Sequence, residues 1–279
     1  MPLHSLIAAA FIAACEDELA APKPGNVHVF AAGHGMEVAD FVHSAQAAAP
    51  ALAGAGRTGV RILRAVEATF AAVGQNTNLG IILLCTPLAV AASQAGDLRQ
   101  NLGDVLNGLD IEDAENAFRA INLASPGGLG AAEHDVRAPA RLTLLAAMQT
   151  AAERDMIAAQ YAFGFAHVFD IGLPALAAAK EKQLGPEWTA LGVYLAFLSA
   201  FPDSHIVRKY GPELAEKVRW RAVPLHSMLL LAADPALILP QILGFDAELK
   251  LAGLNPGTSA DLTVATLFAN RLIHMGRTA

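Results

Sequence analysis

Three polar side chains, Asn76, Thr77 and Asn78, stand directly before an apolar run that starts at Leu79. Asn and Thr oxygens accept hydrogen bonds from the free N–H groups of a helix's first turn, which predicts a helix start here. The same N–H groups could bind a phosphate, and Gly80 would let backbone approach it closely. The helix is too apolar for a surface, so we expect the patch to face an internal cleft. An ordinary helix cap would explain the same residues.

A second group of polar residues lies in the proline-rich segment 22–28. Lys23 could hold a phosphate, and His28 could move a proton or cap a neighbouring helix. Gly25 and Asn26 lie between them on a turn made rigid by two prolines. A stiff surface loop would have the same composition.

The segment 127–135 combines closely spaced glycines with two acids. Backbone N–H groups around Gly128 and Gly130 could approach a ligand, although a short glycine-rich loop is weakly specific. Glu133 and Asp135 could bind a metal ion or act as acids. A solvated charged loop explains the segment equally well.

The segment 202–211 has the densest mixture of acid, hydroxyl, imidazole and cation in the chain. If Asp203 caps a short helix, His205 and Arg208 lie three residues apart on one face, with Lys209 beside them. An aspartate that binds Mg²⁺ next to cations that bind phosphate suits a nucleoside triphosphate. An exposed charged helix would look the same.

A fifth polar segment, which includes Asn255 and Gly257, precedes the last amphipathic stretch. Ser259 or Thr258 is the expected cap of that helix, with Asp261 in the first turn, where a carboxylate favours the helix dipole. Capping could be the whole role of these residues. A second carboxylate at a loop–helix junction could also face the same cleft as the first.

The elements that must position these loops are helical. Periodicity of 3.6 residues recurs along the chain, and strand-like alternation is nearly absent. We predict one all-α domain over residues 1–279, with about a dozen helices and functional loops that converge on one cleft. The expected helices are 3–20, 38–52, 60–73, one from 79, 97–107, 111–124, 139–152, 158–169, 174–183, 186–200, 213–219, 225–233, 236–250 and 259–273.

Composition excludes several classes of protein. The chain of 279 residues is 54% hydrophobic and only 16% charged, which suggests that surface is buried in a homo-oligomer. A net charge of −7 without a basic tract argues against nucleic-acid binding. Cys15 and Cys85 lack metal-ligand spacing and are expected to be core thiols of a cytoplasmic protein. No Lys or Arg precedes the first apolar segment, so we expect a first helix rather than a signal peptide, and no membrane partner.

Four of these segments, taken in order, resemble the triphosphoribosyl-dephospho-CoA synthase family. They are Pro22–Gly25, Asn76–Gly80, Asp203–Gly211 and Asn255–Leu262. The resemblance spans nearly the whole chain, and the family is all-α, in agreement with the periodicity.

The resemblance implies a transferase in which a ribose hydroxyl of dephospho-CoA attacks the anomeric carbon of ATP and adenine leaves. ATP is then a substrate, Mg²⁺ is expected, and the partners are a small-molecule nucleotide and a cofactor precursor. By the same resemblance Lys23, Asn76 and Arg208 would bind phosphates. The wider set of phosphate- and nucleotide-binding candidates is Gly25, Asn26, Thr77, Asn78, Gly80, Gly128, Gly130, Lys209, Asn255, Gly257 and Ser259.

The resemblance also assigns the acids. Asp203 and Asp261 would hold Mg²⁺ or act as the acid and base, with His28 and His205 as further catalytic candidates. The residue types leave the division of roles between the two aspartates open.

The sequence departs from the typical family pattern after Thr77. Asn78 and Leu79 stand where the typical member has a histidine and a lysine, so one cation that could touch the triphosphate is missing. This suggests a divergent branch, similar to homologues in methanogens and methylotrophs. The alternatives are a step in methanopterin- or methanofuran-type cofactor biosynthesis, a Mg²⁺-dependent N-glycoside hydrolase, or a non-catalytic nucleotide-binding helical protein.

Overall fold

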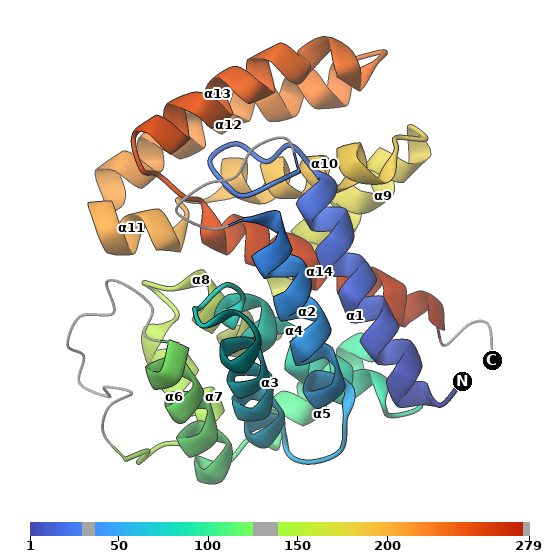
Figure 1. Ribbon diagram of the computed structural model, residues 1–279, viewed down its shortest axis with the longest axis vertical. Helices are drawn as coiled ribbons and strands as arrows, with labels where there is room; N and C mark the ends of the chain where they lie inside the picture. The colour runs from blue at the N-terminus through green and yellow to red at the C-terminus, as the bar shows by residue number, and fades with distance from the viewer. Residues whose placement is uncertain (30–36, 125–138, 276–279) are drawn as a thin grey trace. The chain divides into compact units, whose positions relative to one another are not determined.

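The structure is a computed structural model, and it describes residues 1–29, 37–124 and 139–275. Within these ranges every regular element is a helix: fourteen α-helices, one π-helix and one 3-10 helix (Figure 1). The predicted all-α fold is therefore confirmed. Contacts between Cα atoms divide the chain into two compact units. Two helices, α1 (Leu3–Ala20) and α14 (Gly257–Met275), contribute residues to both units.

Unit 1 comprises residues 1–15, 39–166 and 268–279. Its core is the apolar helix α4, which is buried almost throughout because it packs against four other helices of the unit. The helices that lie in unit 1, apart from the first residue of α2, are α2 (Val38–Ala53), α3 (Thr58–Val73), α4 (Leu79–Ala92), α5 (Leu98–Asn107), α6 (Ile111–Ala124), α7 (Leu144–Ala151) and α8 (Met156–Ala162).

Unit 2 comprises residues 16–38 and 167–267. Its core is α10, in which every residue from 189 to 198 is buried against neighbours that include α9 and α12. The elements that lie wholly in unit 2 are η1 (Val168–Gly172), α9 (Leu173–Glu181), α10 (Pro186–Ala200), α11 (Ser204–Tyr210), α12 (Pro212–Leu231), η2 (Pro235–Ile238) and α13 (Leu239–Leu251).

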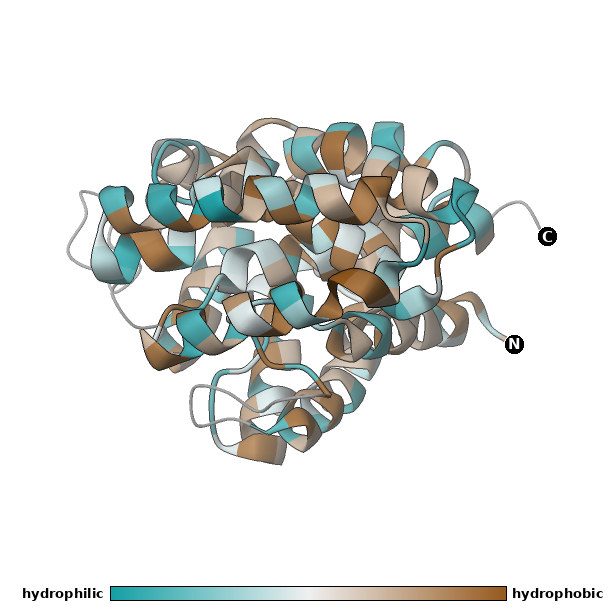
Figure 2. Cartoon of the chain, turned by 90° about the horizontal axis from the view of Figure 1, so that it is seen from above, coloured by the Kyte–Doolittle hydropathy of each residue, from teal (hydrophilic) through white to brown (hydrophobic). Residues whose placement is uncertain are grey.

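Most helices carry hydrophobic and hydrophilic residues side by side (Figure 2), as expected when one face of a helix packs into a core. Cys15 and Cys85 are both buried, which confirms the prediction that they are core residues. No single helix in the described part of the chain is long and apolar enough to cross a membrane. The bent pair α10 and α11 meets the length and composition criteria only when the two helices are taken together.

Several predicted helices differ from the structure. Residues 213–219 and 225–233 were expected to form two helices, but α12 continues through Pro224, whose flanks Ala222 and Leu225 are buried. Burial of this face evidently outweighs the lost hydrogen bond of one proline. The helix expected from Pro139 begins only at Leu144.

The predicted helix 158–169 is interrupted. α8 ends at Ala162, and both Gly164 and Phe165 adopt left-handed backbone conformations, with φ of 60° and 59°. Phe165 is fully buried, so packing of its ring offsets the strain of this conformation. Periodicity alone does not register such a break, because the apolar spacing continues across it. Whether the two units form the predicted single domain stays a prediction.

Candidate functional site

Segment 22–28, predicted to carry chemistry, is buried in unit 2. Lys23 is 0% exposed, and its Nζ pairs with Glu18 in the last turn of α1. Burial lowers the pKa of Lys23 and raises that of Glu18, and the attraction between the two opposes both shifts. Lys250 and Asp261 also lie close enough to influence the Lys23 ammonium. The predicted phosphate ligand is thus part of a buried ion pair.

The turn after Lys23 packs closely against the C-terminal part of unit 2. Gly25 has φ of 80°, and a Cβ there would lie 2.8 Å from Pro256 Cδ, so only glycine fits this position. The backbone N–H of Gly25 donates to Asp246 Oδ1 at 2.8 Å. The Asn26 side-chain amide donates to Asn255 Oδ1, also at 2.8 Å. Two predicted binding loops, more than 200 residues apart in the chain, therefore lie in direct contact.

His28 belongs to a buried polar cluster with two residues of α13. Its Nε2 lies 3.2 Å from Asp246 Oδ2 and 3.3 Å from Lys250 Nζ. Lys250 also donates to Asp246 Oδ2 at 3.0 Å. Burial lowers the pKa of His28 despite the nearby carboxylate, so the imidazole is neutral near pH 7. Burial alone would raise the pKa of Asp246, but the hydrogen bonds it accepts outweigh burial and hold that pKa below its usual value.

Asp203 joins the first turns of two helices. Its Oδ1 accepts hydrogen bonds from the backbone N–H groups of His205 and Ile206 at 2.9 and 3.3 Å, so it caps α11 as expected. Its Oδ2 accepts from the backbone N–H and the hydroxyl of Ser259, both at 2.8 Å. Helix α14 begins at Gly257, so Ser259 lies inside the first turn and is not the cap that was predicted. The Asp203 carboxylate serves both helices.

The surroundings of Asp203 suit a structural acceptor better than a metal ligand. The side chain is 1% exposed, and its two oxygens together accept four hydrogen bonds. Burial raises its pKa, and the donors from Ser259 oppose that shift. The described residues contain no group of three or more His, Cys, Asp or Glu that could hold a metal ion. Mg²⁺ binding by Asp203 and Asp261 stays a prediction.

The other candidates of unit 2 are more accessible. Gly257 packs on the imidazole of His205, since an added Cβ would lie 2.5 Å from His205 Nδ1. Arg208 and Asp261 are partly exposed, and Lys209 is exposed. These side chains could therefore meet a ligand from solvent. The predicted residues Gly128, Gly130, Glu133 and Asp135 lie outside the described residues.

The segment 75–80 lies in unit 1 and starts α4 at Leu79, as predicted. Asn76 Oδ1 accepts the Leu79 N–H at 3.2 Å, so Asn76 supplies the only side-chain cap in this segment. Thr77 donates its hydroxyl proton to Ser44 Oγ of α2 at 2.6 Å. Asn78 makes no capping hydrogen bond. A single cleft shared with the loops of unit 2 stays a prediction.

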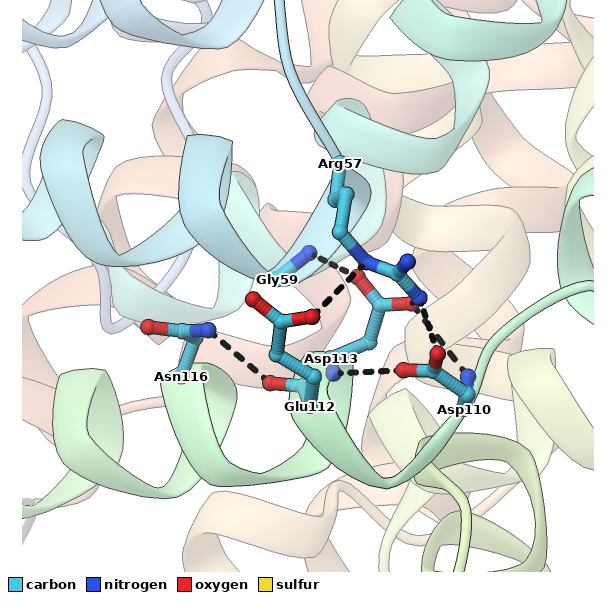
Figure 3. Close-up of polar contacts among 6 residues, drawn as sticks. All are labelled: Arg57, Gly59, Asp110, Glu112, Asp113 and Asn116. Atoms are coloured by element: carbon cyan, nitrogen blue, oxygen red, sulfur yellow. Dashed lines mark hydrogen bonds and ion pairs between the residues drawn. The ribbon is translucent and has the colours of Figure 1, made fainter.

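Unit 1 also contains an ion-pair cluster that was not predicted (Figure 3). Arg57, at the start of α3, pairs with Asp110 and with Asp113 of α6, the latter at 3.1 Å. Asp110 and Asp113 each accept the other's backbone N–H, at 3.1 and 3.2 Å, and Asp113 also accepts the Gly59 N–H at 2.8 Å. The contacts of Arg57 and the bond from the Gly59 N–H join the starts of α3 and α6, whereas the two bonds between Asp110 and Asp113 lie within the start of α6. The cluster therefore stabilises the unit, and two acids three residues apart at the start of helix 111–124 were its signal in the sequence.

Comparison with known proteins decides the family. A family model described as ATP:dephospho-CoA triphosphoribosyl transferase matches residues 4–278. The chain belongs to this family. A relative from Pseudomonas paraeruginosa, provisionally named a 2-(5''-triphosphoribosyl)-3'-dephosphocoenzyme-A synthase, is 26% identical over 221 residues, which is 78% of this chain. The chain spans 65% of the length of that relative.

A solved structure supports the same family. The crystal structure of a protein from Archaeoglobus fulgidus, provisionally assigned as a triphosphoribosyl-dephospho-CoA synthase, is 25% identical in sequence. It superimposes with a TM-score of 0.64 over 82% of this chain and 97% of that chain. The resemblance inferred from the four ordered segments is thereby confirmed at the level of family and fold.

Within this triphosphoribosyl transferase family member, the sequence reading missed Glu18, Asp246 and Lys250. The pair Asp246 and Lys250 had a signal, because the two residues lie four apart in a predicted helix and so on one face. Nothing local indicated that this face would contact residues 25–28 of the chain. For Glu18 the only signal in the sequence was that it lies five residues before Lys23.

Proposed function

We propose that this chain transfers a triphosphoribosyl group from ATP to dephospho-CoA or to a related cofactor precursor. The family match over residues 4–278 carries the proposal. In this reaction the bond from the ribose C1 atom to adenine breaks, and a bond from C1 to the acceptor hydroxyl oxygen forms. The hydroxyl proton must go to a base, and the departing adenine must gain a proton. The site therefore needs one proton acceptor, one proton donor and groups that bind the triphosphate.

Among the buried groups of unit 2, His28 has the chemistry to accept the hydroxyl proton, and because its side chain is 0% exposed the acceptor hydroxyl must displace the packing around it. Burial lowers its pKa, so the imidazole is neutral near pH 7 and one ring nitrogen carries no proton. Asp246 lies 3.2 Å from its Nε2 and would stabilise the imidazolium that forms. Asp246 is in turn held by the Gly25 N–H and by Lys250. These contacts hold Asp246 and the imidazole in place, so Asp246 positions His28 and does not itself take up the proton.

The remaining roles fall to the partly exposed residues of the same unit. Asp261, in the first turn of α14, is the carboxyl group that in its protonated form would give its proton to the leaving adenine and become a carboxylate, because Asp203 already accepts four hydrogen bonds. Arg208 and Lys209 at the end of α11 supply positive charge for phosphates. No step is assigned to Mg²⁺. The proposed partners are small molecules, the low charge content supports the proposal of a homo-oligomer, and the two buried cysteines support that of a cytoplasmic protein.

The proposal is tested by following adenine release from ATP with and without dephospho-CoA. Release that depends on dephospho-CoA is expected, and its rate should fall by about two orders of magnitude or more in His28→Gln, the loss typical of a general base. His43→Gln, which changes an exposed imidazole of α2, is the matched control and should keep the parent rate. Adenine release without any acceptor would instead favour N-glycoside hydrolysis. ATP binding with no release would favour the non-catalytic alternative.

A further inference from the structure

The start of α4 presents hydrogen-bond donors for which the described residues supply no acceptor. The Leu79 N–H is satisfied by Asn76 Oδ1, and the first bond within the helix runs from the Ile82 N–H to the Asn78 carbonyl. Between them, the backbone N–H groups of Gly80 and Ile81 have no acceptor among the described residues. Such groups need a partner, and a helix N-terminus favours a negatively charged one.

An independent feature at the same position points the same way. Asn78 directly precedes α4. Its exposed fraction is 5%, and its side chain makes no capping hydrogen bond to the helix. Its Nδ2 is a buried amide nitrogen without any hydrogen-bond partner in the described structure. A buried donor left unpaired costs on the order of 1–3 kcal/mol, so a ligand oxygen that accepts from it would be favoured.

The segment around these donors is held in place before any ligand arrives. Thr77 bonds to Ser44 of α2, and Ser44 in turn donates to the backbone carbonyl of Asp40 at 2.5 Å. The Gln75 side-chain amide donates to Asp40 Oδ2 at 3.3 Å, so the Asp40 carboxylate already has a hydrogen-bond partner. Gln75, Thr77 and Gly80 are only partly buried, so a ligand can reach the segment. A site fixed in advance loses less conformational entropy on binding.

We propose that the N-terminus of α4, with the Asn78 amide, binds a phosphate group of a phosphorylated ligand. Three donors near one helix start, two backbone N–H groups and the Asn78 amide nitrogen, match the oxygens of a phosphate better than they match a cation. That this phosphate belongs to the triphosphate of ATP rests on the proposed function. The binding site itself rests only on the unmet donors of unit 1.

The probe is inorganic tripolyphosphate, with adenosine as the uncharged comparison, titrated into ¹⁵N-labelled protein. Tripolyphosphate is expected to shift the backbone amide signals of Gly80 and Ile81 and the side-chain amide of Asn78, and adenosine is expected to leave them in place. Asn78→Asp puts a negative charge among the donors, and it should weaken tripolyphosphate binding by about tenfold or more. Because Asp is a good N-cap, this variant should melt no lower than the parent.

Thr143→Asp is the matched control, since it places the same charge at the capped N-terminus of α7. It should leave tripolyphosphate binding unchanged. The proposal is overturned if tripolyphosphate fails to move the three amide signals, or if Asn78→Asp binds it as tightly as the parent. The adenine assay separates the two proposals. Tripolyphosphate bound at α4 without turnover would remove only the proposed function, and turnover unaffected by Asn78→Asp would show that this site does not hold the triphosphate of ATP.

Discussion

The buried ion pair of Lys23 and Glu18 leads to a prediction that separates stability from catalysis. The Lys23 side chain is 0% exposed and that of Glu18 is 6% exposed. Removing two such charges from water costs several kcal/mol per ion, and their attraction repays this only in part. A variant that replaces both charges, Lys23→Met with Glu18→Leu, keeps similar volume. We expect it to be as stable as the parent, or more stable by about 1–4 kcal/mol.

Each single change should behave differently, because it leaves one buried charge without its partner. Glu18→Leu or Lys23→Met alone is expected to lose about 3–5 kcal/mol of unfolding free energy. The Glu18→Leu variant also makes a pH prediction. Burial already lowers the pKa of Lys23 from 10.5, and the loss of Glu18 removes an interaction that raises it. When the pKa of a lysine is lower in the folded state than in the unfolded state, the unfolded state binds more protons between the two pKa values. The free energy of unfolding therefore rises with pH across that interval and falls as pH is lowered. This variant should therefore become more stable as pH rises from about 7 toward 10.

Urea unfolding of the parent, both single variants and the double variant forms a double-mutant cycle that measures the coupling. Single losses below about 1 kcal/mol, or a double variant no more stable than the sum of the singles predicts, would refute the reasoning. If the double variant folds, its turnover shows whether Lys23 also binds phosphate. The resemblance to the family predicts that turnover is lost while stability is kept.

Three further predictions follow from the packing of each unit. Gly59→Ala would place a Cβ 2.5 Å from the backbone of Asp113, so it should lose about 1–3 kcal/mol in urea unfolding, whereas Gly103→Ala, with nothing within 4 Å, should gain about 0.5–1 kcal/mol. Asp203→Asn keeps the shape but has one acceptor oxygen in place of two, so it cannot accept hydrogen bonds at the starts of both α11 and α14, and an unchanged urea midpoint would contradict the expected loss of about 2–4 kcal/mol. His28 has its pKa lowered from 6.5 by burial, so the stability it contributes is present above that pH and lost as pH falls. Thermal melts should show that the melting temperature of the parent falls as pH drops below 6.5, and that this fall is smaller in His28→Asn.

Local patterns in the sequence predicted local structure well. The helix that starts after Asn78 and the cap by Asp203 both follow from hydrogen bonds within three residues, which short-range rules describe. The order of four polar segments was enough to indicate the family. Periodicity missed the break after α8, because the left-handed conformation of Phe165 is held by tertiary packing.

Contacts between distant residues could not be predicted in the same way. The bond from the Gly25 N–H to Asp246 joins residues 221 apart, and the bond from Ser259 to Asp203 joins residues 56 apart. Asp203 was predicted to cap a short helix and to hold Mg²⁺, but its bonds to the start of α14 could not be predicted. Lys23 was predicted to hold a phosphate, because no local pattern shows that a charged residue will be buried against an acid.

The measurement that tests the central claim most directly is the balance between products. Purified protein would be incubated with ATP, Mg²⁺ and dephospho-CoA, and adenine and the coenzyme products would be quantified together by mass spectrometry. The account predicts one adenine for each triphosphoribosylated dephospho-CoA, and neither product in the absence of ATP. Dephospho-CoA that remains unmodified while ATP is bound or cleaved would contradict the claim and direct attention to another acceptor.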